Sequence, residues 1–151
     1  MILFDANLLV HAHAAHSPFH GVASQLRDQA AHGELTACVT PQVLCEFFAI
    51  CTDARRFQPA LSPKQATHEI RRYWQESRFR RILPTAGTMA RLVDLLTRQP
   101  LGQQRVFDAF LVATMLENGV RTIYTRNVKD FEIYHELQVI NPLVAAARPA
   151  R

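Results

Sequence analysis

Met1-Ile-Leu-Phe-Asp-Ala-Asn-Leu-Leu-Val10 is the stretch of sequence on which the predicted fold depends. Its apolar run leads directly into Asp5, and such a run ending at a turn-forming polar residue is typical of a buried strand in a parallel sheet. Ligands of these sheets bind just outside the carboxyl ends of the strands, which is where we expect Asp5 to lie. Aspartate also caps the first N–H groups of a following helix, so Asp5 alone does not distinguish a functional role from a structural one.

Length and composition describe an ordinary globular protein of one domain. The chain has 151 residues, of which 48% are hydrophobic and 20% are charged. No apolar run approaches the roughly 20 residues of a membrane helix, and the start lacks the basic segment of a signal peptide. The odd number of cysteines favours reduced thiols in the core over disulfides, at Cys38, Cys45 and Cys51. We therefore expect a cytoplasmic protein without a membrane partner, and its net charge of +4 mildly favours a phosphate-bearing partner.

Predicted strands and helices alternate along the chain. Besides the first strand, the pattern predicts strands at 35–39, 79–83, 122–125 and 138–140, and helices at 7–15, 19–32, 42–51, 63–77, 87–98 and 106–118. A loop is expected at 98–104. Alternation of this kind implies right-handed crossovers and a parallel sheet covered on both faces. We expect a single domain over residues 1–142 and a frayed tail over 143–151.

Four of the 13 acidic residues occupy positions that a solvated surface does not explain. Asp5 ends the first strand, Asp108 opens an apolar helix and Asp130 follows the fourth strand. Glu46 is expected to be embedded in an apolar helix, where an unpaired carboxylate is costly. If the first strand is central, all four acids can reach its carboxyl end. Carboxylates gathered there repel one another unless a cation neutralises them, and oxygen ligands favour Mg²⁺ or Mn²⁺ over zinc.

Four motifs, in this order and at these spacings, carry a resemblance to a known family. They are Asp5-Ala-Asn7, Glu46, Phe107-Asp108-Ala-Phe-Leu-Val-Ala-Thr114 and Thr125-Arg-Asn-Val-Lys-Asp-Phe131. Each motif is weak alone, but together they resemble the PIN-domain nucleases over nearly the whole chain. Within that family the sequence is most similar to the VapC-type toxins of bacterial toxin–antitoxin pairs.

The resemblance implies a fold, an activity and partners. The fold is a PIN-like α/β/α sandwich around a central parallel sheet of four to five strands. The activity is that of a Mg²⁺- or Mn²⁺-dependent endoribonuclease, which hydrolyses RNA phosphodiester bonds with a metal-activated water. The protein is expected to form a homodimer that is neutralised by a cognate antitoxin protein.

The resemblance also implies roles for individual residues. Asp5 and Asp108 are expected to be metal ligands, Glu46 is expected to be the third acid, and Asn7 would orient Asp5 or the metal-bound water. All three acids are thus candidate catalytic residues.

The motif that begins at Thr125 departs from the family pattern. The family often has an acid two residues after this threonine, where the present chain has Asn127. Asp130, three residues further on, is the nearest acid and the candidate for the fourth catalytic position. Either Asp130 or Asn127 completes the metal site, with Thr125 and Asn127 in supporting roles, or Asp130 only caps the turn that follows.

Two other groups of residues have both a functional and a structural interpretation. His11, His13, His16 and His20 suggest zinc, but the spacing of His11 and His13 does not place them on one helix face and no cysteine is near. The arginine-rich stretch 71–81 contains Tyr73 and Trp74, which could stack on unpaired bases. Core aromatics beside a solvated arginine face are the more common arrangement.

Two functions of other classes compete with the nuclease. One is a non-catalytic RNA- or protein-binding module on the same fold. The other is a phosphoacceptor signalling domain, which is weaker because it needs an acid pair after the first strand, where Asp5 stands unaccompanied.

Overall fold

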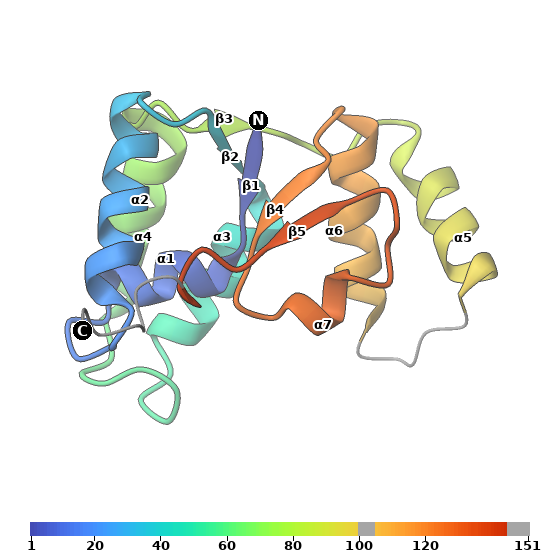
Figure 1. Cartoon of the computed structure of the whole chain (residues 1–151). Coiled ribbons are helices and arrows are strands. Elements are labelled where there is room, and N and C mark those ends of the chain that lie inside the picture. The colour runs from blue at the N-terminus through green and yellow to red at the C-terminus, as the bar shows by residue number, and fades with distance from the viewer. Residues whose placement is uncertain (100–104, 145–151) are drawn as a thin grey trace, which may run out of the picture.

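The protein is described by a computed structural model that covers residues 1–99 and 105–144. Strands and helices alternate through most of the chain (Figure 1). In chain order they are β1 (Ile2–Phe4), α1 (Ala6–His13), α2 (His20–His32), β2 (Ala37–Val39), α3 (Pro41–Cys51), α4 (Pro63–Arg71), the π-helix η1 (Arg72–Glu76), β3 (Arg80–Arg81), α5 (Thr88–Arg98), α6 (Val106–Glu117), β4 (Thr122–Tyr124), α7 (Val128–Phe131) and β5 (Gln138–Ile140).

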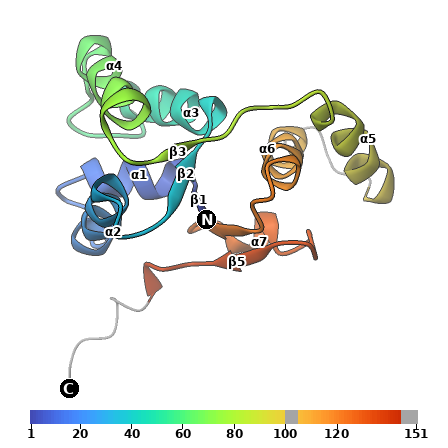
Figure 2. The ribbon, with the colours of Figure 1, turned by 90° about the horizontal axis from the view of Figure 1, so that it is seen from above.

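The strands form one parallel sheet of five strands with β1 at its centre. Their order is β3-β2-β1-β4-β5, and Leu3 lies opposite Cys38 on one side and Ile123 on the other. Helices α1, α2 and α4 lie on one side of the strands, and α5 and α6 lie on the other (Figures 1 and 2). The predicted α/β/α sandwich with a central first strand is therefore confirmed.

Local signals in the sequence explain where several helices begin and end. The Thr40 hydroxyl accepts a hydrogen bond from the Val43 N–H, and Pro41 follows in the first turn of α3. Ser62 and Gln65 form a reciprocal capping box at the start of α4. Gly33 ends α2 at a φ of 81°, which glycine adopts without a steric penalty. The helix predicted at 63–77 is interrupted, because its second half is the π-helix η1.

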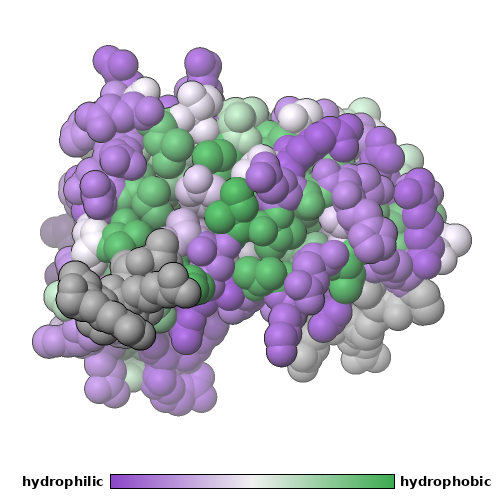
Figure 3. Space-filling model, in the orientation of Figure 1, coloured by the Kyte–Doolittle hydropathy of each residue, from purple (hydrophilic) through white to green (hydrophobic). Residues whose placement is uncertain are grey.

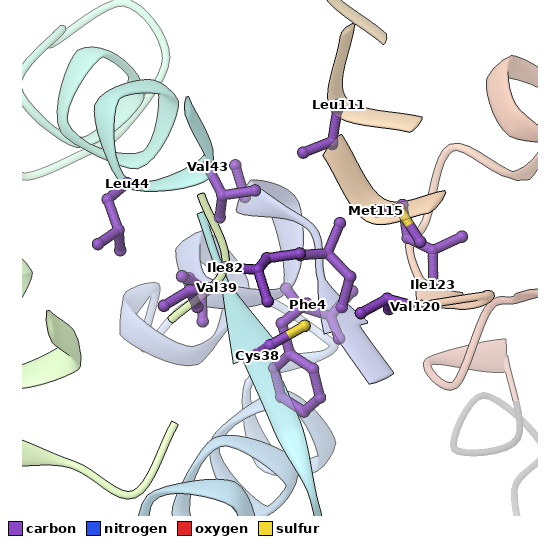
Figure 4. Close-up of a cluster of buried hydrophobic side chains, with 14 of the residues drawn as sticks. Phe4, Cys38, Val39, Val43, Leu44, Ile82, Leu111, Met115, Val120 and Ile123 are labelled. Carbon is purple, nitrogen blue, oxygen red and sulfur yellow. The ribbon is translucent and has the colours of Figure 1, made fainter. Parts of the chain in front are cut away.

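The core lies between the sheet and the helices on each side of it. Figure 4 shows Phe4, Val39 and Ile123 from three strands meeting Val43 of α3 and Met115 of α6. Of the three predicted core thiols, Cys38 and Cys51 are buried, but Cys45 is exposed on α3, so that prediction was wrong for Cys45.

The surface and the chain ends complete the description. In the view of Figure 1, apolar side chains show through the middle of the molecule, over β4 and β5, and hydrophilic ones cover the outer helices (Figure 3). Leu143 is fully buried against Ala12 and Ala23. The remainder of the predicted tail, residues 145–151, and most of the loop expected at 98–104 lie outside the described residues. No helix within the described ranges is long and apolar enough to cross a membrane.

Candidate active site

Asp5 lies at the carboxyl end of the central strand and begins α1. Its side chain is only 5% exposed and accepts three hydrogen bonds. Oδ1 accepts from the Ala6 N–H at 2.7 Å, and Oδ2 accepts from Asn7 Nδ2 at 2.5 Å and from the Thr125 hydroxyl at 2.6 Å. The structural interpretation is thus also correct, since Asp5 caps α1. One carboxylate oxygen satisfies the helix start, and the other is held by side chains.

Asn7 and Thr125 join the ends of β1 and β4 around Asp5. Asn7 Nδ2 also contacts the Thr125 Oγ1 at 3.1 Å, and Asn7 Oδ1 accepts from the Arg126 N–H at 3.0 Å. The Thr125 Oγ1 in turn accepts from the Asn127 N–H at 3.0 Å. These contacts fix the carboxylate of Asp5 in one orientation. The geometry is that expected of residues which orient an acid.

Asp108 lies in the first turn of α6, where a carboxylate interacts favourably with the helix dipole. Gln42 ties this turn to α3, because its Nε2 donates to the backbone oxygen of Phe107 at 2.8 Å. The pKa of Asp108 is raised to about 6, first by burial and then by the negative charges of Asp130 and Asp5, while Arg105 opposes the shift. A carboxyl group with this pKa is one that a neighbouring cation would stabilise in its charged form.

Glu46 is not buried inside α3, so the expectation of an embedded carboxylate was wrong. Val43, Leu44 and Phe47 face the core, whereas Glu46 lies on the exposed side of the helix. Its pKa is nevertheless raised, by desolvation and by the charges of Asp5 and Asp108. Glu46 therefore faces the same acids from the solvent side, and no ion pair within the described residues neutralises it.

Asp130 and Asn127 differ in what they face. The charge of Asp130 raises the pKa of both Asp5 and Asp108, and its carboxylate lies 3.7 Å from Nη2 of Arg105. Asn127 is exposed and precedes α7, with its backbone N–H bound to Thr125. Of the two candidates, Asp130 is the one whose charge acts on the other acids.

The acids thus come from four elements and meet at one end of the sheet. The carboxyl ends of β1 and β4, the start of α6 and helix α7 all lie at the lower end of the sheet in Figure 1. Burial raises the pKa of Asp5 most, the charge of Asp130 adds to this shift, and the hydrogen bonds from Thr125, Ala6 and Asn7 oppose it. Mutual repulsion at this edge is what the sequence predicted.

The donor set suits a hard divalent cation, although the side chains are not closed around one. Within residues 1–99 and 105–144, no group of three or more His, Cys, Asp or Glu side chains forms a ready metal site. The chemistry still fits, because the nearby groups are carboxylate oxygens that repel one another, and Mg²⁺ binds through few carboxylates while keeping several waters. Asp5, Asp108 and Glu46 are the residues that would hold it, with Asp130 beside them.

A family model for the PIN domain matches residues 2–135, a span that contains all four acids. The chain belongs to the PIN domain family. Two similar proteins are ribonucleases of Mycobacterium tuberculosis. Ribonuclease VapC24 is 25% identical over 145 residues, which cover 96% of this chain and 99% of that protein. Ribonuclease VapC48 is 27% identical over 142 residues, which cover 92% and 95%. The resemblance to VapC-type PIN proteins is thereby confirmed.

Solved structures share the fold of this PIN domain. One is the Mycobacterium tuberculosis toxin VapC20, which cleaves the sarcin–ricin loop, with a TM-score of 0.67, 18% identity, and coverage of 89% of this chain and 95% of that chain. Another is VapBC2 of Rickettsia felis bound to a promoter DNA fragment, with a TM-score of 0.62, 17% identity, and coverage of 93% and 98%. At these identities the likeness concerns the fold.

The histidines predicted as a possible zinc group have other partners in this PIN domain. His11 Nδ1 lies 2.8 Å from the Ser17 hydroxyl, and His13 Nε2 lies 3.0 Å from the Tyr73 hydroxyl. Tyr73 is buried, and the Arg81 guanidinium lies 5.9 Å from the ring centre of Trp74. For Tyr73, the core interpretation was therefore correct.

Sequence reasoning missed three residues around the acids. Gln42 precedes Glu46 by four residues and Arg105 precedes Asp108 by three, so helical spacing could have indicated both. Tyr134 is buried, and the charge of Asp108 contributes to raising its pKa to about 12, after burial. Its position depends on the turn after α7, which no sequence pattern specified.

Proposed function

We propose that this PIN domain is a Mg²⁺- or Mn²⁺-dependent endoribonuclease and the toxin of a toxin–antitoxin pair. The observation that supports this most is the set of mutually repelling carboxylates at the carboxyl end of the central strand, in which Asp5, Asp108 and Glu46 have no cationic partner among the described residues. A structural role does not explain why charges of one sign are gathered there.

The residues divide the work by position. Asp5, Asp108 and Glu46 would hold the ion, and Asp130 would add charge from α7. Asn7 and Thr125 keep the Asp5 carboxylate oriented through the hydrogen bonds described above. When bound, the ion polarises a phosphate oxygen and activates the attacking water.

Groups around the acids suit a single-stranded RNA substrate. Arg105 lies beside Asp130 and Asp108, and the charge of Arg56 lowers the pKa of Glu46. Arginines at these places can bind the phosphates on each side of the cleaved bond. Phe107 precedes Asp108 and is 68% exposed, which leaves its ring free to stack on an unpaired base.

The partners are also part of the proposal. Several structures with this fold are toxin–antitoxin complexes by their titles, including one from Klebsiella pneumoniae. We infer a cognate antitoxin for this chain, and a homodimer for which the exposed Met89 and Val93 of α5 offer an apolar contact surface. The activity belongs in the cytoplasm, where the RNA is.

The test is cleavage of total RNA by the purified, antitoxin-free protein with Mg²⁺ or with EDTA. We expect cleavage only with Mg²⁺, and loss of cleavage in Asp5→Asn. Asp28→Asn is the matched control, because Asp28 is an exposed aspartate on α2 that pairs with Arg27. If the protein binds RNA and Mg²⁺ produces no turnover in any preparation, the non-catalytic binding module is the better description.

A further inference from the structure

The hydroxyl group of Tyr134 is buried without a hydrogen-bond partner. Tyr134 is 3% exposed, and its Oη and Gln42 Oε1 are the buried side-chain atoms left unpaired within the described residues. An unpaired buried hydroxyl destabilises a fold, so its retention calls for a role outside the packing.

The turn after α7 aims this hydroxyl toward the acids. The Tyr134 N–H donates to the Phe131 oxygen at 3.0 Å, and the Tyr134 oxygen accepts from the Leu137 N–H at 2.9 Å, so the backbone on each side is fixed. Asp130 of α7 lies 3.7 Å from Arg105, next to the start of α6, and α7 lies beside the lower end of α6 in Figure 1. The charges of Asp108 and Arg105 both act on the Tyr134 hydroxyl. Its pKa of about 12 keeps the proton on the oxygen, so it remains a donor.

Asp108 lacks the complementary group. Its carboxylate has no hydrogen bond and no ion pair within residues 1–99 and 105–144, whereas Asp5 accepts three hydrogen bonds. A carboxylate that binds a cation through one oxygen is usually oriented by a donor to the other oxygen. An unpaired donor and an unpaired acceptor thus lie beside each other at the candidate metal site.

We propose that the Tyr134 hydroxyl is the positioning group for Asp108, and that it donates to the carboxylate oxygen turned away from a bound divalent cation. Asp108 would then be held by Tyr134 as Asp5 is held by Asn7 and Thr125. Tyr134 acts through Asp108 and does not touch the substrate. This inference rests on the proposed function, because it requires the acids to bind a divalent cation.

The experiment compares Tyr134→Phe with the parent protein in two measurements. Mg²⁺ affinity is taken from isothermal titration or from the rise in melting temperature with Mg²⁺, and stability without metal is taken from urea unfolding in EDTA. We expect Mg²⁺ binding about tenfold weaker, the lower end of what loss of such an orienting group costs. Stability in EDTA should stay equal or rise, since the missing hydroxyl had no partner.

Tyr73→Phe is the matched control. Tyr73 is a buried tyrosine too, but its hydroxyl lies 3.0 Å from His13 Nε2 in a separate cluster. This variant should lose stability in EDTA and keep the Mg²⁺ affinity of the parent, which is the reverse of the pattern for Tyr134→Phe.

Two results would overturn the inference alone. One is an unchanged Mg²⁺ affinity in Tyr134→Phe, and the other is a loss of metal-free stability as large as that of Tyr73→Phe. Absence of Mg²⁺ binding to the parent protein is a different result, which would reject the proposed function and the inference together.

Discussion

Helix α1 has a polar cluster at each end, and the two clusters are built on opposite principles. At its start, Asp5 faces Asp108, Asp130 and Glu46, so charges of one sign accumulate. At its end, His13 faces groups that complement it.

The cluster at the end of α1 is satisfied within the protein. His13 Nε2 lies 3.0 Å from the Tyr73 hydroxyl and 3.4 Å from Glu69 Oε2, and Arg72 lies 3.1 Å from the same carboxylate. Polar groups that satisfy one another stabilise a fold, whereas like charges left facing each other destabilise it. The comparison teaches that unmatched charge, more than the presence of polar residues, distinguishes a candidate site from structural polarity.

The strongest test of this difference removes one acid from the cluster at the start of α1. Asp5→Asn and Asp108→Asn should each lower Mg²⁺-dependent RNA cleavage by at least about 10²-fold, the scale for loss of one charge-stabilising group at a reacting centre. Both should remain folded, since asparagine also caps helices and Asp108 has no partner to lose among the described residues. Cleavage rates and far-UV circular dichroism are measured together. Undiminished cleavage by Asp5→Asn at low Mg²⁺ would remove the metal-site interpretation.

Glu46→Gln separates a functional from a structural role on α3. Because Glu46 is exposed, the substitution should change the free energy of unfolding by no more than about 0.5 kcal/mol, while cleavage falls by roughly tenfold or more. Denaturant titration and an activity assay check both values. Breaking a buried pair with an arginine would instead cost about 3–5 kcal/mol, and that result with retained activity would assign Glu46 to the fold.

The cluster at the end of α1 should respond in the opposite way. Tyr73→Phe should lower the free energy of unfolding by about 1–2 kcal/mol, because His13 loses a hydrogen-bond partner. Cleavage by the folded protein should be unchanged. Urea unfolding and a rate per folded molecule are the measurements, and a loss of rate without a loss of stability would show that the two clusters are coupled.

Asp130 and Asn127 sharpen the comparison within the acid cluster. Asp130→Ala should raise the Mg²⁺ concentration for half-maximal cleavage several-fold, with the rate partly restored at high Mg²⁺ by mass action. Asn127→Asp should lower that concentration, because it adds a charge near the ion. Mg²⁺ titrations of cleavage, with Asn127→Ala alongside, give the values. If only Asn127→Ala moves the curve, the site uses three carboxylates and an amide, and Asp130 is a cap.

The smallest expected effect is a pH dependence of stability without metal. The folded pKa of Asp108 is about 6, against about 3.9 in an unfolded chain, so the folded protein keeps a proton that the unfolded chain has lost. Stability from this group is therefore present below about pH 4 and is lost as pH rises to about 6. Urea unfolding in EDTA at several pH values should show a smaller decline for Asp108→Asn than for the parent. A steeper decline in the variant would contradict the assignment.

The architecture and the four acids were predictable from local patterns. An apolar run ending in Asp5 gave the central strand, and the start of an apolar helix gave the position of Asp108. Glu46 was misplaced because the apolar content of α3 was read without its periodicity. Val43 and Phe47 turn inward, but the side of the helix with Glu46 turns outward.

Other features depend on tertiary geometry that no local pattern contains. The four-residue helix α7 decides that Asp130, and not Asn127, acts on the other acids. The turn after it decides where the Tyr134 hydroxyl lies. Both follow from how the chain returns from β4 to β5, which depends on packing across the sheet rather than on sequence neighbours.

The hydrogen bond from Thr125 to Asp5 joins residues 120 positions apart, and it has a consequence for synthesis. The ribosome makes β1 first, but one neighbour of β1 in the sheet, β4, is made only in the last quarter of the chain. Pairing between such distant segments waits until both have been translated. A nascent or prematurely ended chain without β4 therefore has Asp5 but not the contacts that orient it. If the protein is a toxin, its gene yields no assembled site until translation is nearly complete.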